Sequence, residues 1–62
     1  MNQKEINQEI YRETRRISNG DTALCLEFLK FMKDENKGIE DLLDMEDLSL
    51  AEREYIKQLI EE

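Results

Sequence analysis

Hydrophobic residues in the first third of the chain recur with the spacing of one side of a helix. This stripe consists of Ile6, Ile10 and Ile17, with Thr14 between them and Tyr11 beside them. Asn2 followed by Glu5 three positions later has the pattern of a helix N-cap. Asn19 and Gly20 favour the left-handed conformation that ends a helix, so we expect the first helix to end near Ser18.

The middle of the chain predicts a second helix with a wide apolar side. Asp21 or Thr22 can cap it, it should run to about Asn36, and Gly38 stands where a C-terminal glycine belongs. At helical spacing the apolar residues fill an arc of about 160°; they are Leu24, Cys25, Phe28, Leu29, Phe31 and Met32. An arc this wide indicates a central helix contacted from two sides. Leu26 falls outside the arc, and we expect it to be exposed.

The last third of the chain predicts a short helical segment and then a longer helix. The short segment carries Ile39, Leu42 and Leu43, and it is interrupted around residues 45–48. Ser49 and Glu52 form the pattern of a capping box. The apolar positions of the last helix are Leu50, Tyr55, Ile56, Leu59 and Ile60. We therefore predict an all-α fold in one domain spanning residues 1–62, a small bundle or orthogonal array of three main helices plus one short helix.

The charge of the chain is unevenly distributed. The total is −7. Residues 1–20 carry a net charge of +1, residues 21–38 carry −1, and residues 39–62 carry −7. A segment this acidic repels nucleic acid and anionic lipid and attracts basic surfaces. The alternative interpretation is that the acids serve only to keep the protein soluble.

The residue types needed for catalysis are largely missing. The chain has no histidine, and its one cysteine, Cys25, lies in the apolar arc, where burial suppresses the reactivity of a thiol. The acidic cluster around Asp41, Asp44 and Asp47 lacks the spacing of a calcium-binding loop. No glycine-rich phosphate loop is present. The sequence therefore predicts a protein that is not an enzyme and that has no cofactor and no metal site.

Residues 38–60 resemble a helix-turn-helix motif in the order of their elements. A short helix is followed by a turn at Asp47 to Ser49 and a second helix. The usual glycine of the turn is replaced by Asp47, and the usual small residue of the first helix by Leu43. The exposed side of the second helix carries acids as well as Arg53 and Lys57, and this disfavours DNA binding.

The sequence does not resemble a membrane or an exported protein. No run approaches the roughly 20 apolar residues of a membrane span, and the polar N-terminus does not resemble a signal peptide. We expect a cytoplasmic protein. Its composition suits a bacterial or phage accessory protein.

Three functions are compatible with these features. The first is a binding module, a small regulatory or inhibitory protein whose apolar helical face with an acidic rim docks on another protein or on a second copy of itself. The second is an acidic mimic of nucleic acid that inhibits a DNA- or RNA-binding protein, and the third is a helix-turn-helix-like regulator. The expected partner-binding residues are Leu26, Asp44, Asp47, Glu54, Tyr55 and Glu61. The four acids among them form the row expected of a mimic if they face the same way.

Overall fold

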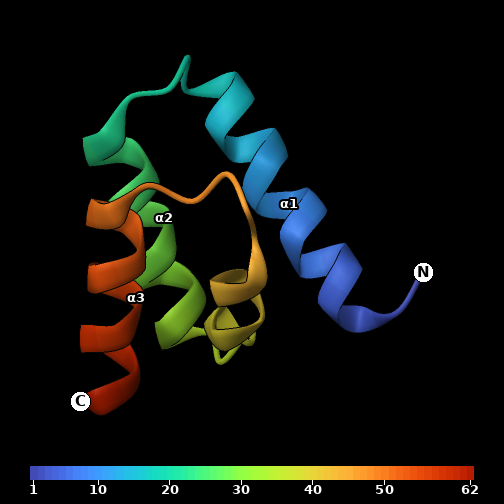
Figure 1. Cartoon of the computed structure of the whole chain (residues 1–62), viewed down its shortest axis with the longest axis vertical. Helices are drawn as coiled ribbons and strands as arrows, with labels where there is room; N and C mark the ends of the chain where they lie inside the picture. The colour runs from blue at the N-terminus through green and yellow to red at the C-terminus, as the bar shows by residue number, and fades with distance from the viewer.

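A computed structural model describes all 62 residues of the protein, as an all-α fold without strands. The elements are α1 (Gln3–Ile17), α2 (Thr22–Asp34), η1 (Ile39–Asp44), which is a short 3₁₀ helix, and α3 (Leu50–Glu61). α2 and α3 pack side by side, η1 packs against all three α-helices, and α1 slants away from the α2–α3 pair (Figure 1). The predicted fold of three main helices and one short helix is confirmed.

The helices begin at the predicted caps. The Asn2 side chain accepts a hydrogen bond from the Glu5 amide at 2.9 Å, and the Asp21 side chain accepts one from the Leu24 amide at 3.3 Å. Ser49 forms the predicted capping box with residue 52 at the start of α3. These contacts satisfy amide groups that have no partner inside the helix, so each helix start is determined locally.

Both long helices that are followed by a turn end on an asparagine in the left-handed conformation. Asn19 has φ 59° and Asn36 has φ 57°. In each case the next residue donates its amide across the turn, from Gly20 to the Arg15 carbonyl at 3.0 Å and from Lys37 to the Met32 carbonyl at 2.9 Å. These are Schellman motifs. The predicted end of the first helix is confirmed. The last residue of α2 is Asp34, and the left-handed residue that closes this helix is Asn36, not the predicted Gly38. Gly38 is instead the N-cap of η1.

One cluster of ten buried side chains forms the hydrophobic core. It consists of Tyr11, Cys25, Leu29, Met32, Ile39, Leu42, Met45, Leu48, Ile56 and Leu59. Every element contributes to this cluster, but α1 contributes only Tyr11. The loop between η1 and α3 is held by the Arg53 guanidinium, which donates to the carbonyls of Leu43 at 2.7 Å and Met45 at 3.4 Å.

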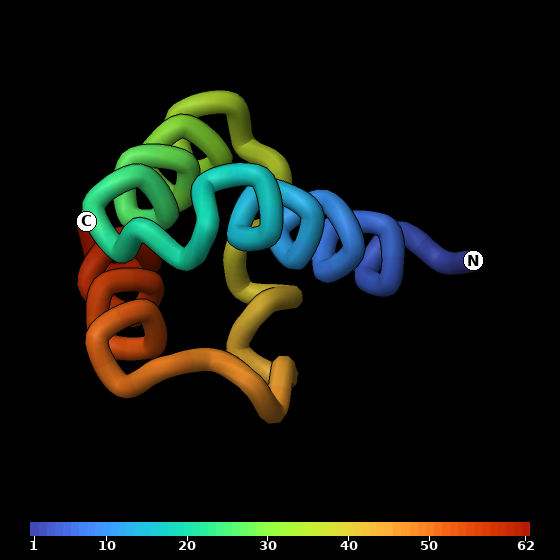
Figure 2. The backbone as a smooth tube through the Cα atoms, turned by 90° about the horizontal axis from the view of Figure 1, so that it is seen from above, coloured from blue at the N-terminus to red at the C-terminus, as the bar shows by residue number.

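The apolar stripe of α1 does not pack in the core. Ile6, Ile10 and Ile17 are exposed, and Asn7 and Tyr11 are the buried residues of this helix. The physical reason is that the rest of the protein offers α1 mainly polar partners, so its hydrogen-bonding side turns inward. Seen from above, the first turns of α1 extend beyond the other helices (Figure 2).

The predicted faces of α2 and α3 are correct only in part. Cys25, Leu29 and Met32 are buried as expected, but Leu24 and Phe31 are exposed because the buried side of α2 is rotated toward Leu26. In α3, Ile56 and Leu59 are buried, whereas Leu50 and Ile60 are exposed. α3 packs against α2 on the side that carries Leu26. The buried arc of α2 is therefore turned away from Phe31, whose ring faces solvent. No helix combines the length and the hydrophobicity needed to cross a membrane.

Candidate functional site

Exposed apolar side chains occupy the outward sides of α1 and α2. Ile6, Ile10 and Ile17 of α1 and Leu24 and Phe31 of α2 are between 37 and 71 % exposed, and Phe28 is half-buried. We call these six residues the outer α1–α2 face. The three isoleucines share one side of α1 at spacings of four and seven residues, and the three α2 residues share one side of α2 in the same way.

Aromatic stacking joins the two helices within the outer α1–α2 face. The Phe28 ring stacks on the Tyr11 ring with centroids 6.5 Å apart and on the Phe31 ring with centroids 5.9 Å apart. Ile10 and Phe28 line the same shallow depression, together with Glu9, Glu13 and Thr14. Ile10, Phe28 and Phe31 therefore belong to one surface, with carboxylates at its α1 border.

The apolar residues of α1 face solvent because its polar residues bind the rest of the protein. The Asn7 amide donates to the Asp41 carboxylate at 2.9 Å, and the Gln8 amide donates to the Asp41 carbonyl at 2.9 Å. Lys4 forms an exposed ion pair with Asp44. Within α1, Lys4 and Gln8 lie roughly opposite the isoleucine stripe and Asn7 lies beside it, so these contacts keep the stripe turned outward.

A buried carboxylate connects α1 to the start of α3. Glu52 is 6 % exposed and accepts hydrogen bonds from the Tyr11 hydroxyl and, at 3.1 Å, from the Ser49 amide. Burial acts to raise the pKa of Glu52, but the hydrogen bonds from Tyr11 and Ser49 and the charge of Arg15 outweigh it, so this pKa lies below its ordinary value. Burial and the bond to Glu52 raise the pKa of Tyr11. Glu52 is therefore held ionised, with the Tyr11 hydroxyl as its donor.

Arg15 completes this cluster from the solvent side. Its guanidinium Nη1 donates to the Asp47 carbonyl at 2.9 Å and to the Asp47 carboxylate at 3.3 Å. Its Nε lies 3.9 Å from the Glu52 carboxylate, and its Cζ lies 5.2 Å from the centroid of the Tyr11 ring. The nitrogens Nε and Nη2 are buried without a hydrogen-bond acceptor. The cluster thus joins α1 to α3 through charge and hydrogen bonds across sequence separations of 32 and 41 residues.

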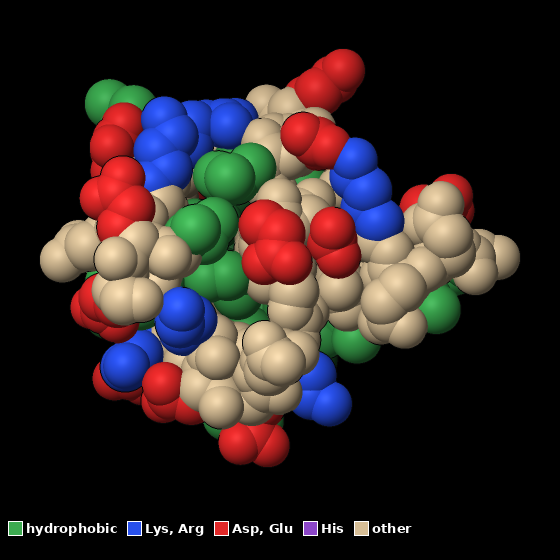
Figure 3. Space-filling model, turned by 90° about the horizontal axis from the view of Figure 1, so that it is seen from below, with side chains coloured by type: hydrophobic (Ala, Val, Ile, Leu, Met, Phe, Trp, Pro, Cys, Tyr) green, Lys and Arg blue, Asp and Glu red, His purple; other side chains and the backbone are tan.

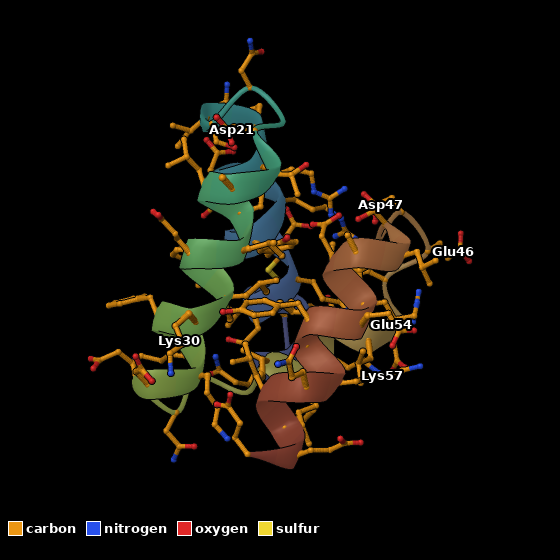
Figure 4. The ribbon with its side chains drawn as sticks, turned by 90° about the vertical axis from the view of Figure 1, so that its left-hand side faces the viewer. Asp21, Lys30, Glu46, Asp47, Glu54 and Lys57 are labelled. Atoms are coloured by element: carbon orange, nitrogen blue, oxygen red, sulfur yellow. The ribbon has the colours of Figure 1, made fainter.

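The predicted row of acids is only partly available to a partner. Lys4 binds Asp44 and lowers the pKa of that carboxyl, and Arg15 binds Asp47. Glu54 and Glu61 have no ion-pair partner and, seven residues apart, share one side of α3. Glu46, Asp47, Glu54 and Lys57 all lie on the side of α3 that faces away from α2, so a base stands among these acids (Figure 4).

Two predicted partner-binding residues are part of the interior packing. Leu26 and Tyr55 are each half-buried against the core. The expectation that Leu26 is exposed is therefore wrong, and its place as an apolar contact is taken by Leu24 and Phe31. The sequence does not show whether Leu26 or the pair Leu24 and Phe31 faces the core. Each choice gives α2 an apolar arc of the same width.

The underside of the molecule carries a second, smaller group of hydrophobic side chains surrounded by charges (Figure 3). A cleft there is lined by Met32, Ile39 and Ile60 and by the charged side chains of Lys33, Lys37 and Glu40. No group of three or more acidic or cysteine side chains is placed to hold a metal ion. Cys25 is buried, with its Sγ 3.7 Å from the Ser18 hydroxyl.

The segment that resembles a helix-turn-helix has a different first element. Ile39–Asp44 forms a 3₁₀ helix and not an α-helix, and the backbone from Met45 to Ser49 is extended at both ends. Comparison with family models, with curated proteins and with solved structures found no match.

Proposed function

We propose that this protein is a non-catalytic protein-binding module, a small regulatory or inhibitory protein of the cytoplasm that docks through its outer α1–α2 face. The single observation that carries the proposal is that five large apolar side chains of two neighbouring helices, from Ile6 to Phe31, are exposed. Exposed apolar surface of this kind marks interaction sites, because leaving it in water is unfavourable.

The rest of the molecule supports an interaction through this face. The fold turns Asn7 and Tyr11 of α1 to the core and leaves the isoleucines in solvent. Helix-in-groove recognition uses apolar anchors at this helical spacing. Glu9 and Glu13 stand at the border of the face, as expected for an apolar patch with an acidic rim.

The acidic segment 39–62 favours a protein over nucleic acid as the partner. Its net charge of −7 repels a phosphate backbone and keeps the protein soluble while an apolar face is exposed. The segment also contains the buried residues of η1 and α3, and all of its acids except Glu52 lie on the outside of this packed structure.

Site-specific photocrosslinking tests the proposal. Benzoylphenylalanine in place of Phe31 should give one discrete protein adduct in a lysate of the source cells, and adding Ile10→Asp to the same chain should remove it. The matched control places the same photoreactive residue at Leu50, which is 73 % exposed on α3 outside the face. Equal labelling from positions 31 and 50, or no adduct from position 31, would contradict a docking role for the outer α1–α2 face.

A further inference from the structure

The charges of the segment that forms α1 and α2 are balanced, in contrast to those of the rest of the chain. Residues 1–38 carry seven acids and seven bases, so the whole net charge of −7 belongs to residues 39–62. A basic foreign segment would be drawn to the acidic part and not to α1 and α2. A balanced surface instead suits a partner of the same composition, because a two-fold interface brings a patch against itself.

An antiparallel pair of α1 helices brings the isoleucine stripes of two copies together. Ile6 and Ile17 are eleven residues apart, which corresponds to about 16 Å along a helix. If two copies of α1 lie antiparallel, Ile6 of each copy meets Ile17 of the other at both ends of the contact. Ile10 then lies near the two-fold axis, beside Glu13 of the second copy.

Charged residues on the border of the face match in the same antiparallel register. Glu9 precedes Ile10, and Arg16 precedes Ile17. When Ile6 meets Ile17 of the second copy, Glu9 comes beside Arg16 of that copy, and the two-fold axis repeats this pair. Glu9 and Arg16 now bind Arg12 and Glu13 of their own helix in exposed ion pairs, which contribute little and are easily exchanged.

The α2 part of the face extends the same contact. Leu24 and Phe31 are exposed beside α1, and Phe28 connects them to Ile10 across the shared depression. A second copy covering α1 therefore also covers these side chains, while Glu54, Glu61 and the acids of the loop stay on other sides of the molecule. The like charges of the two acidic segments are kept out of the interface.

We propose that the outer α1–α2 face binds a second copy of this chain, with the two α1 helices antiparallel and Glu9 of each copy beside Arg16 of the other. This inference rests on the proposed function, because it names the occupant of the same face. The dimer is isologous, with four helices at the interface.

Sedimentation equilibrium of the full chain at low salt tests the occupant. The wild type should reach twice the chain mass of 7.5 kDa as concentration rises. Ile10→Asp places a charge at the centre of the interface and should raise the dimer dissociation constant by about a hundredfold or more, since central apolar anchors dominate such contacts. Leu50→Asp should leave it unchanged, and far-UV circular dichroism should show the same helix content in all three. A wild type that stays monomeric at every concentration overturns the proposal.

A charge exchange tests the antiparallel register. Glu9→Arg and Arg16→Glu should each raise the dissociation constant by roughly three- to thirtyfold, because each loses two pairs and creates like-charge contacts. The double variant should return to within about threefold of the wild type, although inside one helix it sets Arg beside Arg12 and Glu beside Glu13. A double variant weaker than either single variant shows that these residues act only within their own helix, and it overturns the proposed register.

The two proposals fail in different ways. A monomeric wild type whose position 31 still labels a different protein overturns the second copy as occupant and leaves the docking face standing. A monomeric wild type with no adduct from position 31 overturns both. An adduct between two copies, lost in Ile10→Asp, supports both.

Discussion

The α2–α3 pair and helix α1 are held in the same small fold by different forces. α2 and α3 meet through apolar side chains such as Leu29, Ile56 and Leu59, all of which are buried. α1 adds only Tyr11 to the core, and its other attachments are hydrogen bonds and ion pairs to η1, the following loop and Glu52. The stability that comes from apolar packing changes little with pH, whereas the stability that comes from a paired, ionised side chain is lost when that side chain changes its protonation. The difference indicates that α1 is the part of the fold that solution conditions can loosen.

This division also explains why the isoleucine stripe of α1 is exposed. A helix that is attached through hydrogen bonds and ion pairs can leave its apolar side in solvent. A helix that is attached through apolar contacts buries that side in the core. α2 stands between these cases, because its arc is wide enough to supply Cys25, Leu29 and Met32 to the core and still expose Leu24 and Phe31.

The largest effect on stability should come from disrupting the apolar contact between α2 and α3. Leu29→Ala removes a fully buried side chain from the α2 contact and should lower the free energy of unfolding by about 2–5 kcal/mol, which includes the cost of the cavity. In a chain of this size that loss is comparable with the total stability. Urea denaturation followed by circular dichroism measures it. Leu50→Ala, at an exposed position of α3, should change the free energy by less than about 0.5 kcal/mol; similar losses in both variants would disprove an α2–α3 core centred on Leu29.

A smaller and more local effect is expected from the link between α1 and α3. Tyr11→Phe keeps the ring in the core but removes the hydroxyl donor of a buried carboxylate, and it should cost about 1–3 kcal/mol. Native-state hydrogen exchange should show the loss as faster exchange in α1, by about tenfold for each 1.4 kcal/mol, with less change in α2 and α3.

The control for this link is the other tyrosine. Tyr55 is half-buried and its hydroxyl makes no hydrogen bond to the protein, so Tyr55→Phe should leave exchange in α1 unaltered. Equal acceleration of all three α-helices in Tyr11→Phe would show that α1 opens only with the whole fold, and the contrast between the two regions would then be lost.

Local signals predicted the helix boundaries, and long-range contacts decided which side of α1 is buried. The caps at Asn2 and Ser49 and the turn at Asn19 depend on residues within a few positions, so the sequence shows them directly. The choice between the isoleucine stripe and Tyr11 depends on a hydrogen bond to Glu52, 41 residues away. Because hydrophobic periodicity counts Tyr11 as one apolar residue against three, it selects the wrong side. The α1 part of the outer α1–α2 face was not predicted for the same reason, because periodicity alone does not show which side of a helix is buried.

The last and smallest effect tests the charge of Glu52 through pH. The folded pKa of Glu52 is depressed, so its ionised form contributes stability that is present above the pKa of the unfolded chain and is lost as pH falls through the lower folded pKa.

Glu52→Gln keeps the capping pattern with Ser49 but removes the charge. It should lower the free energy of unfolding by about 1–2 kcal/mol at pH 7, and the difference from the wild type should shrink steadily below about pH 4.5. Glu54→Gln, at an exposed carboxylate without an ion-pair partner, is the matched control and should follow the wild-type pH profile. Urea denaturation at several pH values between about 3 and 7 measures all three proteins. If Glu52→Gln instead keeps a constant deficit down to pH 3, the charge of Glu52 does not hold α1 to α3, and α1 is attached through Tyr11 packing and its contacts with η1 and the following loop.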